Sequence, residues 1–122
     1  MIQIVWQYEI KEESRGRFEL AYGPGGAWSI LFARAPGYRG TALLRDTQSP
    51  RKYMTVDAWD TEEHHRDFLD QHGEEYEAMD AGLSELIDSE TRVGAFKLLA
   101  EATVRPAPRQ TGGRPGARRR SR

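Results

Sequence analysis

The stretch from Lys52 to Phe68 constrains the fold most strongly, because its pattern predicts a strand that leads directly into a helix. Two sets of side chains, Tyr-Thr-Asp-Trp and Met-Val-Ala, alternate over residues 53–59, and this period is typical of a strand with two different faces. Asp60 then lies three residues before Glu63, which is the capping-box pattern of a helix N-terminus. The pattern therefore predicts a strand that ends at Trp59 and a helix that Asp60 caps.

The remaining elements follow from similar patterns. Alternation of apolar and polar side chains predicts further strands over residues 2–10, 38–46 and 91–99. Two helical pieces, separated by a Gly-Pro-Gly-Gly break, are predicted between the first and second strands. The order β, α, β, β, α, β predicts an α+β, ferredoxin-like fold with a four-stranded antiparallel sheet and helices on one face.

The helix after Trp59 is predicted to be long and to carry one inward stripe. The residues at helical spacing on this stripe are His65, Phe68, Leu69, His72, Tyr76, Met79, Leu83 and Leu86. Gly73 and Gly82 interrupt the stripe, and glycine weakens a helix, so a kink or break is expected near Gly73.

The predicted strands carry apolar side chains on both faces, as with Ile4 beside Val5 and Trp59 beside Val56. Helices on one side can cover only one of these faces. The simplest cover for the other face is a second copy of the chain, so the sequence predicts a homodimer that forms through the sheets.

Composition limits the class of protein. The chain has 122 residues, of which 38% are hydrophobic and 30% charged, which is ordinary for one folded domain. It has no cysteine, and no apolar run approaches the length of a membrane span, so neither a disulfide nor a membrane contact is expected. With no recognisable signal peptide, a cytoplasmic location is the expectation.

The C-terminal segment differs from the rest of the chain. Residues 105–122 contain seven arginines and no acidic residue. The segment is also rich in proline and glycine and has no large apolar side chain, so residues 1–100 are predicted to form the folded domain and residues 101–122 a disordered basic tail. Such a tail is expected to be a passive extension, and nucleic-acid binding through its arginines is the weaker alternative.

Residues 1–99 resemble the antibiotic biosynthesis monooxygenase family of the dimeric α/β-barrel superfamily. The resemblance rests on the opening strand 2–10, the Ala35-Pro-Gly-Tyr38 turn, the hairpin through Arg51-Lys-Tyr53, and Trp59 followed by Asp-Thr-Glu-Glu. It implies a ferredoxin-like homodimer. It also implies one of several activities, because the family includes cofactor-free monooxygenases that form quinones, haem-degrading enzymes and members of unknown role.

Two departures from the family pattern disfavour haem degradation. In the haem-binding branch of the family that the chain resembles, a histidine follows the tryptophan by about three helical turns. This chain has Phe68-Leu69 in that region. The strand-one asparagine of that branch is also absent, with only Gln3 and Gln7 nearby. The cofactor-free branch fits better through Trp59, although this strand carries threonine and aspartate rather than an asparagine.

Candidate catalytic residues lie on and after the strand that ends at Trp59. The ring of Trp59 is expected either to pack in the core or to form a wall of an apolar pocket for a planar aromatic substrate. His65 and His72 are candidate bases, since a neutral imidazole can take a proton from a hydroquinone, whereas the alternative for each is a hydrogen-bonded core residue. The residues expected to contact the substrate are Thr55, Asp57, Phe68 and Tyr76.

A metal site is not expected. His64 and His65 are adjacent and His72 is two turns further on, so neither spacing is the four-residue one that directs two histidines at one metal. Arg45 and Asp57 lie on neighbouring strands and are expected to form a surface ion pair, and contact of Arg45 with an anionic substrate is the alternative.

The leading hypothesis is therefore a monooxygenase without metal or flavin, acting on a polycyclic aromatic or quinol-type small molecule. The alternative is a non-catalytic small-molecule-binding or accessory dimer of the same fold. No cofactor is expected in either case.

Overall fold

The computed structural model describes residues 1–101 and 107. The elements are β1 (Ile2–Ile10), η1 (Glu12–Ser14), α1 (Arg15–Tyr22), α2 (Ala27–Phe32), β2 (Tyr38–Arg45), β3 (Lys52–Trp59), α3 (Glu62–Leu83), η2 (Ser84–Leu86) and β4 (Ile87–Lys97). This order confirms the predicted ferredoxin-like fold. The predicted tail lies outside the described residues apart from 101 and 107, so its disorder and its nucleic-acid binding stay predictions.

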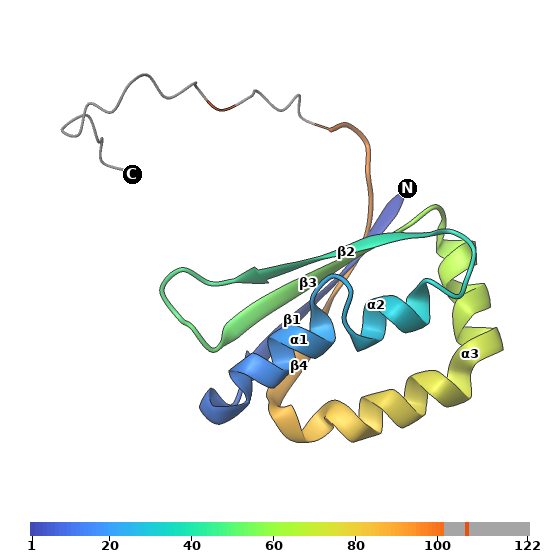
Figure 1. The fold of residues 1–122 in the computed structure, drawn as a ribbon. Coiled ribbons are helices and arrows are strands. Elements are labelled where there is room, and N and C mark those ends of the chain that lie inside the picture. Colours follow the sequence, from blue (N-terminus) through green and yellow to red (C-terminus); the bar gives the residue numbers. More distant parts are fainter. Residues whose placement is uncertain (102–106, 108–122) are drawn as a thin grey trace.

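The strands form one antiparallel sheet in the order β2-β3-β1-β4. Figure 1 shows α1, α2 and α3 on the same side of this sheet. The register places Ile4 of β1 opposite Asp57 of β3, and Thr41 of β2 opposite Asp57 on the other side. The predicted two-faced character of β3 is confirmed, because Tyr53, Thr55 and Trp59 are buried beneath the helices.

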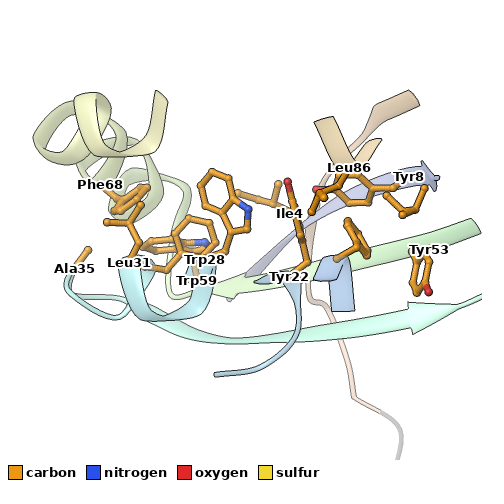
Figure 2. Close-up of a cluster of buried hydrophobic side chains, with 13 residues drawn as sticks. Ile4, Tyr8, Tyr22, Trp28, Leu31, Ala35, Tyr53, Trp59, Phe68 and Leu86 are labelled. Carbon is orange, nitrogen blue, oxygen red and sulfur yellow. The ribbon is translucent and has the colours of Figure 1, made fainter. Parts of the chain in front are cut away.

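Aromatic rings dominate the core between sheet and helices. The largest fully buried side chains are Trp59, Tyr53, Phe18, Phe68, Ile10 and Leu86. Figure 2 shows Trp59, Phe68 and Leu31 gathered where α2 and α3 meet the end of β3. The helical pieces are therefore held to the sheet by ring packing, whose favoured tilted and edge-to-face geometries recur among these residues.

The N-terminus of α3 corrects one prediction. Thr61, not Asp60, is the N-cap: its backbone is extended, and its hydroxyl accepts a hydrogen bond from the N–H of His64 at 3.0 Å. Asp60 instead accepts from Arg39 Nε at 2.6 Å. The helix thus begins one residue later than the capping-box pattern indicated.

The kink predicted near Gly73 is confirmed. His72 has non-helical backbone angles, φ −123° and ψ 25°, so α3 is two helical segments that meet at this residue. The bend is visible in Figure 1.

Strand β4 is longer at its start than predicted, beginning at Ile87 instead of Thr91. Its pairing with β1 shifts register between Val5 and Trp6. Gly94 lies at this bulge with φ +154°, a backbone conformation that favours glycine. The bulge changes which β4 side chains face the helices, and alternation alone does not predict it.

The face of the sheet away from the helices is uncovered in the single chain. Leu44, Val93 and Phe96 expose 49%, 45% and 48% of their surface there, and Val5, Met54 and Val56 are half-buried around them. This is the apolar second face that the sequence predicted.

No helix among the described residues is both long and apolar enough to cross a membrane.

Candidate active site

A cavity lies between the helix-covered face of the sheet and the three helices. Its volume is about 50 Å³, and it is open to solvent on one side. Its aromatic lining residues are Trp6, Tyr8, Tyr22, Trp28, Phe32 and Tyr76. The polar lining residues are Thr55, Asp57, His65, Asp80 and Glu90. A hollow with mostly aromatic walls and a few converging polar groups is the usual form of a small-molecule site.

The cavity opens toward β4 and the first turns of α3. A neighbouring hollow shares His65 and Tyr76 with it and is lined further out by Glu62, Arg66 and Arg92. His65 therefore stands between the cavity and its mouth. Two arginines and one glutamate make the mouth positively charged.

His65 is held by the end of β3 and the start of α3. Its ring packs edge-on against Trp59, with ring centroids 5.2 Å apart and an interplanar angle of 66°. Burial lowers the pKa of His65, and the nearby charges of Arg92 and Arg66 lower it further. The imidazole is therefore neutral near pH 7 and able to accept a proton.

Asp57 is the deepest carboxylate of the cavity. Thr41 Oγ1 donates a hydrogen bond to Asp57 Oδ1 at 2.6 Å, and Tyr38 in turn contacts the Thr41 hydroxyl. Burial raises the pKa of Asp57 to about 6, although the bond from Thr41 opposes this shift. The predicted ion pair between Arg45 and Asp57 is wrong, because the register places Thr41 beside Asp57 and brings Arg45 to Glu19, at 3.5 Å.

The tyrosines of the cavity are hydrogen-bonding groups and not bases. Burial raises the pKa of Tyr8 and of Tyr76, and it raises the pKa of Tyr22 to about 12. All three phenols therefore stay protonated at neutral pH and can donate to a substrate oxygen.

The structure brings together some of the predicted site residues and separates others. Thr55, Asp57, His65 and Tyr76 line the cavity, as the shared inward positions of strand and helix implied. Trp59 does not line the cavity, so of the two alternatives for its ring the structure has packing in the core and not a cavity wall. It is fully buried behind His65, because Phe32 and Phe68 close over it at the end of β3.

Phe68 and His72 also lie outside the cavity lining. Phe68 is 1% exposed and belongs to the core. His72 stacks on the outer side of Phe68, and its Nδ1 lies 2.8 Å from Glu75 Oε1. The non-helical backbone at His72 turns the ring out of the stripe that the periodicity predicted. The prediction that His72 faces the cavity is therefore wrong.

Several cavity and mouth residues escaped the sequence reasoning. Tyr8 shares the inward alternation of β1 with Ile4, so its place there was a usable signal. Asp80 follows Tyr76 by one helical turn, but a charged residue is not counted in a stripe defined mainly by apolar side chains. Glu90 and Arg92 face the helices only because of the bulge in β4.

Within the described residues, no group of three or more His, Asp or Glu side chains is arranged to hold a metal ion.

Comparisons with known proteins connect this geometry to a family. The family model for antibiotic biosynthesis monooxygenase matches residues 1–80. No curated protein matches the chain. Solved structures do match the chain, but their sequence identities are so low that they show only a shared fold.

A protein of Bordetella bronchiseptica assigned to the antibiotic biosynthesis monooxygenases has 24% identity and a TM-score of 0.66, over 81% of this chain and 97% of that one. SnoaB of Streptomyces nogalater, a cofactor-independent oxygenase, has 23% identity and a TM-score of 0.65, over 84% and 95%. A variant of MhuD with two manganese protoporphyrin IX molecules per active site has 17% identity and a TM-score of 0.64, over 85% and 100%. The match of the family model over most of the folded region shows that this chain belongs to the antibiotic biosynthesis monooxygenase family.

Proposed function

We propose that the chain is a cofactor-independent monooxygenase that oxidises an electron-rich polycyclic aromatic or quinol-type molecule with O2. The observation that carries this proposal is the neutral imidazole of His65 inside a cavity with aromatic walls. Flat aromatic walls suit a planar substrate, and a neutral base is what such a substrate needs in order to react with oxygen.

His65 is the proposed general base. It takes a proton from an acidic hydroxyl or ring C–H of the substrate, and the resulting anion is electron-rich enough to transfer an electron to O2. For an anthrone, the ring CH2 becomes C=O, one oxygen atom enters the product and the other leaves as water. The substrate supplies all four electrons that O2 takes up, so no external reductant is required.

The other residues have positioning roles in this proposal. Trp59 holds the ring of His65 by its edge-to-face contact and does not touch the substrate. Tyr76, Thr55 and Asp57 line the same cavity and orient substrate oxygen atoms by hydrogen bonds. Arg66 and Arg92 at the mouth stabilise the developing negative charge near His65.

The test is oxygen uptake with a panel of anthrones and hydroquinones, with wild type beside His65→Ala. The matched control is His72→Ala, because it removes a histidine of the same helix that lies outside the cavity. We expect His65→Ala to lower kcat by about 100-fold or more, the usual contribution of a general base, and His72→Ala to leave it within about threefold. Uptake unaffected by His65→Ala would contradict the assigned base.

The alternative function, a non-catalytic binding or accessory protein, predicts the same cavity without turnover. Folded protein that binds the panel molecules, seen as quenching of tryptophan fluorescence, yet consumes no oxygen above the spontaneous rate with any of them would favour this alternative. Haem degradation is disfavoured, because Phe68 and Leu69 occupy the helix region in which the haem-binding branch of the family has a histidine.

We also propose that the chain forms a homodimer through the uncovered face of its sheet. Leu44, Val93 and Phe96 there are about half exposed in the single chain. A contiguous apolar surface on a folded protein is costly to leave in water. In a dimer with a two-fold axis, this patch of one chain would pack against the same patch of the second chain.

A further inference from the structure

One end of the cavity has no task in the proposed oxidation. It lies away from His65, where Asp80 of α3 and Glu90 of β4 complete the lining. Both residues are exposed and form part of the cavity's outer lining. Partial burial raises the pKa of Glu90, and the charge of Asp80 raises it further. Among the ion pairs of the described residues, none involves Asp57, Asp80 or Glu90. The cavity thus carries negative charge without a cation of its own to balance it.

The walls around this end are also suited to a cation. Tyr8 lies opposite Glu90 in the sheet register, and Tyr76 is one turn before Asp80. Trp28 and Tyr22 complete the aromatic lining, with ring centroids 6.0 Å apart. The faces of such rings attract an ammonium group electrostatically, and carboxylates at the same place strengthen the attraction.

A second observation points independently to a polar ligand. Trp28 is 7% exposed, and its Nε1–H has no hydrogen-bond acceptor among the described residues. Figure 2 shows this nitrogen on the edge of the ring that faces Ile4 and Tyr22, two residues of the cavity lining. A buried indole N–H without an acceptor is unfavourable, so an oxygen of a bound molecule is the natural partner.

The cavity is therefore polarised along its length. Arg92 and Glu90 lie on the same face of β4, opposite Trp6 and Tyr8 respectively. The mouth beside His65 is positive through Arg66 and Arg92, whereas the far end is negative. A ligand with charge of both signs would be held in one orientation only.

We propose that the cavity selects an aromatic substrate that carries a protonated amine, with the ammonium group between Asp80 and Glu90 and the acidic, oxidisable end of the ring system against His65. An oxygen on the ring system accepts the hydrogen bond of Trp28. This inference rests on the proposed function of the cavity as the site of an aromatic substrate.

Binding of three matched probes tests the inference without any need for turnover. The probes are anthracenylmethyl-trimethylammonium, anthracenylmethanol and anthracenylacetate, which share one ring system and differ in charge. Quenching of tryptophan fluorescence reports their affinities. We expect the ammonium probe to bind about tenfold more tightly than the alcohol, and the acetate to bind most weakly.

Charge variants of Asp80 and Glu90 test whether the preference for the ammonium probe arises at this end of the cavity. In Asp80→Asn/Glu90→Gln the ammonium and alcohol probes should bind alike, with the alcohol unchanged from wild type. Asp80→Lys should reverse the preference toward the acetate. The matched control is Glu77→Gln, because Glu77 is exposed on the same helix and outside the cavity lining, and it should leave the preference intact.

The outcomes separate this inference from the proposed function. An alcohol probe that binds as tightly as the ammonium probe would overturn the inference and leave the oxygenase proposal standing. A preference for ammonium that survives in the double variant would also overturn it, because the cation would then bind elsewhere on the acidic surface. Failure of every probe to bind folded wild-type protein would overturn both proposals.

Discussion

The two faces of the sheet differ in what covers them and in what they carry. On β3, Thr55 and Asp57 face the helices and line the cavity, whereas Met54 and Val56 face the other way and lie half-buried on an open surface. On the covered face, burial raises the pKa of Asp57 and lowers that of His65. One strand therefore separates the proposed chemistry from the proposed dimer interface by alternation alone. The predictions below challenge that separation.

The largest effect is expected in the core of the covered face. Phe68→Ala should lower the free energy of unfolding by about 3–5 kcal/mol, because it removes a fully buried ring that packs against Phe32 and Trp59. Urea unfolding followed by circular dichroism measures this. The control is Leu20→Ala, since Leu20 is 78% exposed and its loss should change stability by less than about 0.5 kcal/mol. Equal losses for the two variants would mean that the covered face is not the main core.

The open face is tested by introducing a charge. Phe96→Glu should weaken the homodimer by at least about 100-fold, because a two-fold axis buries two copies of the carboxylate in one interface. Light scattering against concentration should then show the 13.9 kDa single chain where wild type gives twice that mass. Lys97→Gln makes the same change in net charge at the next position of β4 and should leave the dimer intact. Wild-type protein that is monomeric at micromolar concentration would contradict the proposed interface.

A smaller effect concerns the carboxylate of the covered face. Because burial raises the pKa of Asp57 to about 6, its ionised form destabilises the fold fully above that pH. The penalty shrinks as the pH falls from 6 and disappears near pH 4, where the same carboxyl in the unfolded chain also takes up a proton. Asp57→Asn should therefore stabilise the protein at pH 7 by about 1–3 kcal/mol, and the gain should shrink toward pH 4. Urea titrations at several pH values measure both quantities.

Asp46 provides the opposite control. Hydrogen bonds from the backbone N–H groups of Gln48 and Ser49 lower the pKa of this exposed carboxyl. Asp46→Asn should not stabilise the protein at pH 7. A gain for Asp57→Asn that does not depend on pH would show that charge burial is not its cause.

Alternation and helical periodicity in the sequence predicted the features that are set within a single strand or helix. They predicted the order of helices and strands along the chain, the two-faced β3, the open apolar face and the inward positions of Thr55, Asp57, His65 and Tyr76. Where several elements meet, they failed. Periodicity left open whether Trp59 packs in the core or forms a cavity wall, and rings from α2 and α3 decide this by covering it, so that it packs behind His65.

The other failures arise from local irregularity. His72 leaves the stripe of α3 because the helix is interrupted at that very residue, and no periodic template includes the interruption. Glu90 and Arg92 enter the cavity and its mouth because a bulge shifts the register of β4. The alternation of β4 in the sequence therefore does not predict that Glu90 and Arg92 face the cavity.

The smallest predicted effect distinguishes the sequence pattern from the structure at the start of α3. Thr61→Ala should lower the free energy of unfolding by about 1 kcal/mol, because it removes the acceptor of the His64 N–H. Asp60→Ala should lower it by less than about 0.5 kcal/mol, because it loses only the exposed ion pair with Arg39. Thr61→Ser keeps the hydroxyl and should restore most of the loss. A larger effect at Asp60 would mean that the capping box of the sequence describes the helix better than the structure does, and the first turn that carries His65 would then begin one residue earlier.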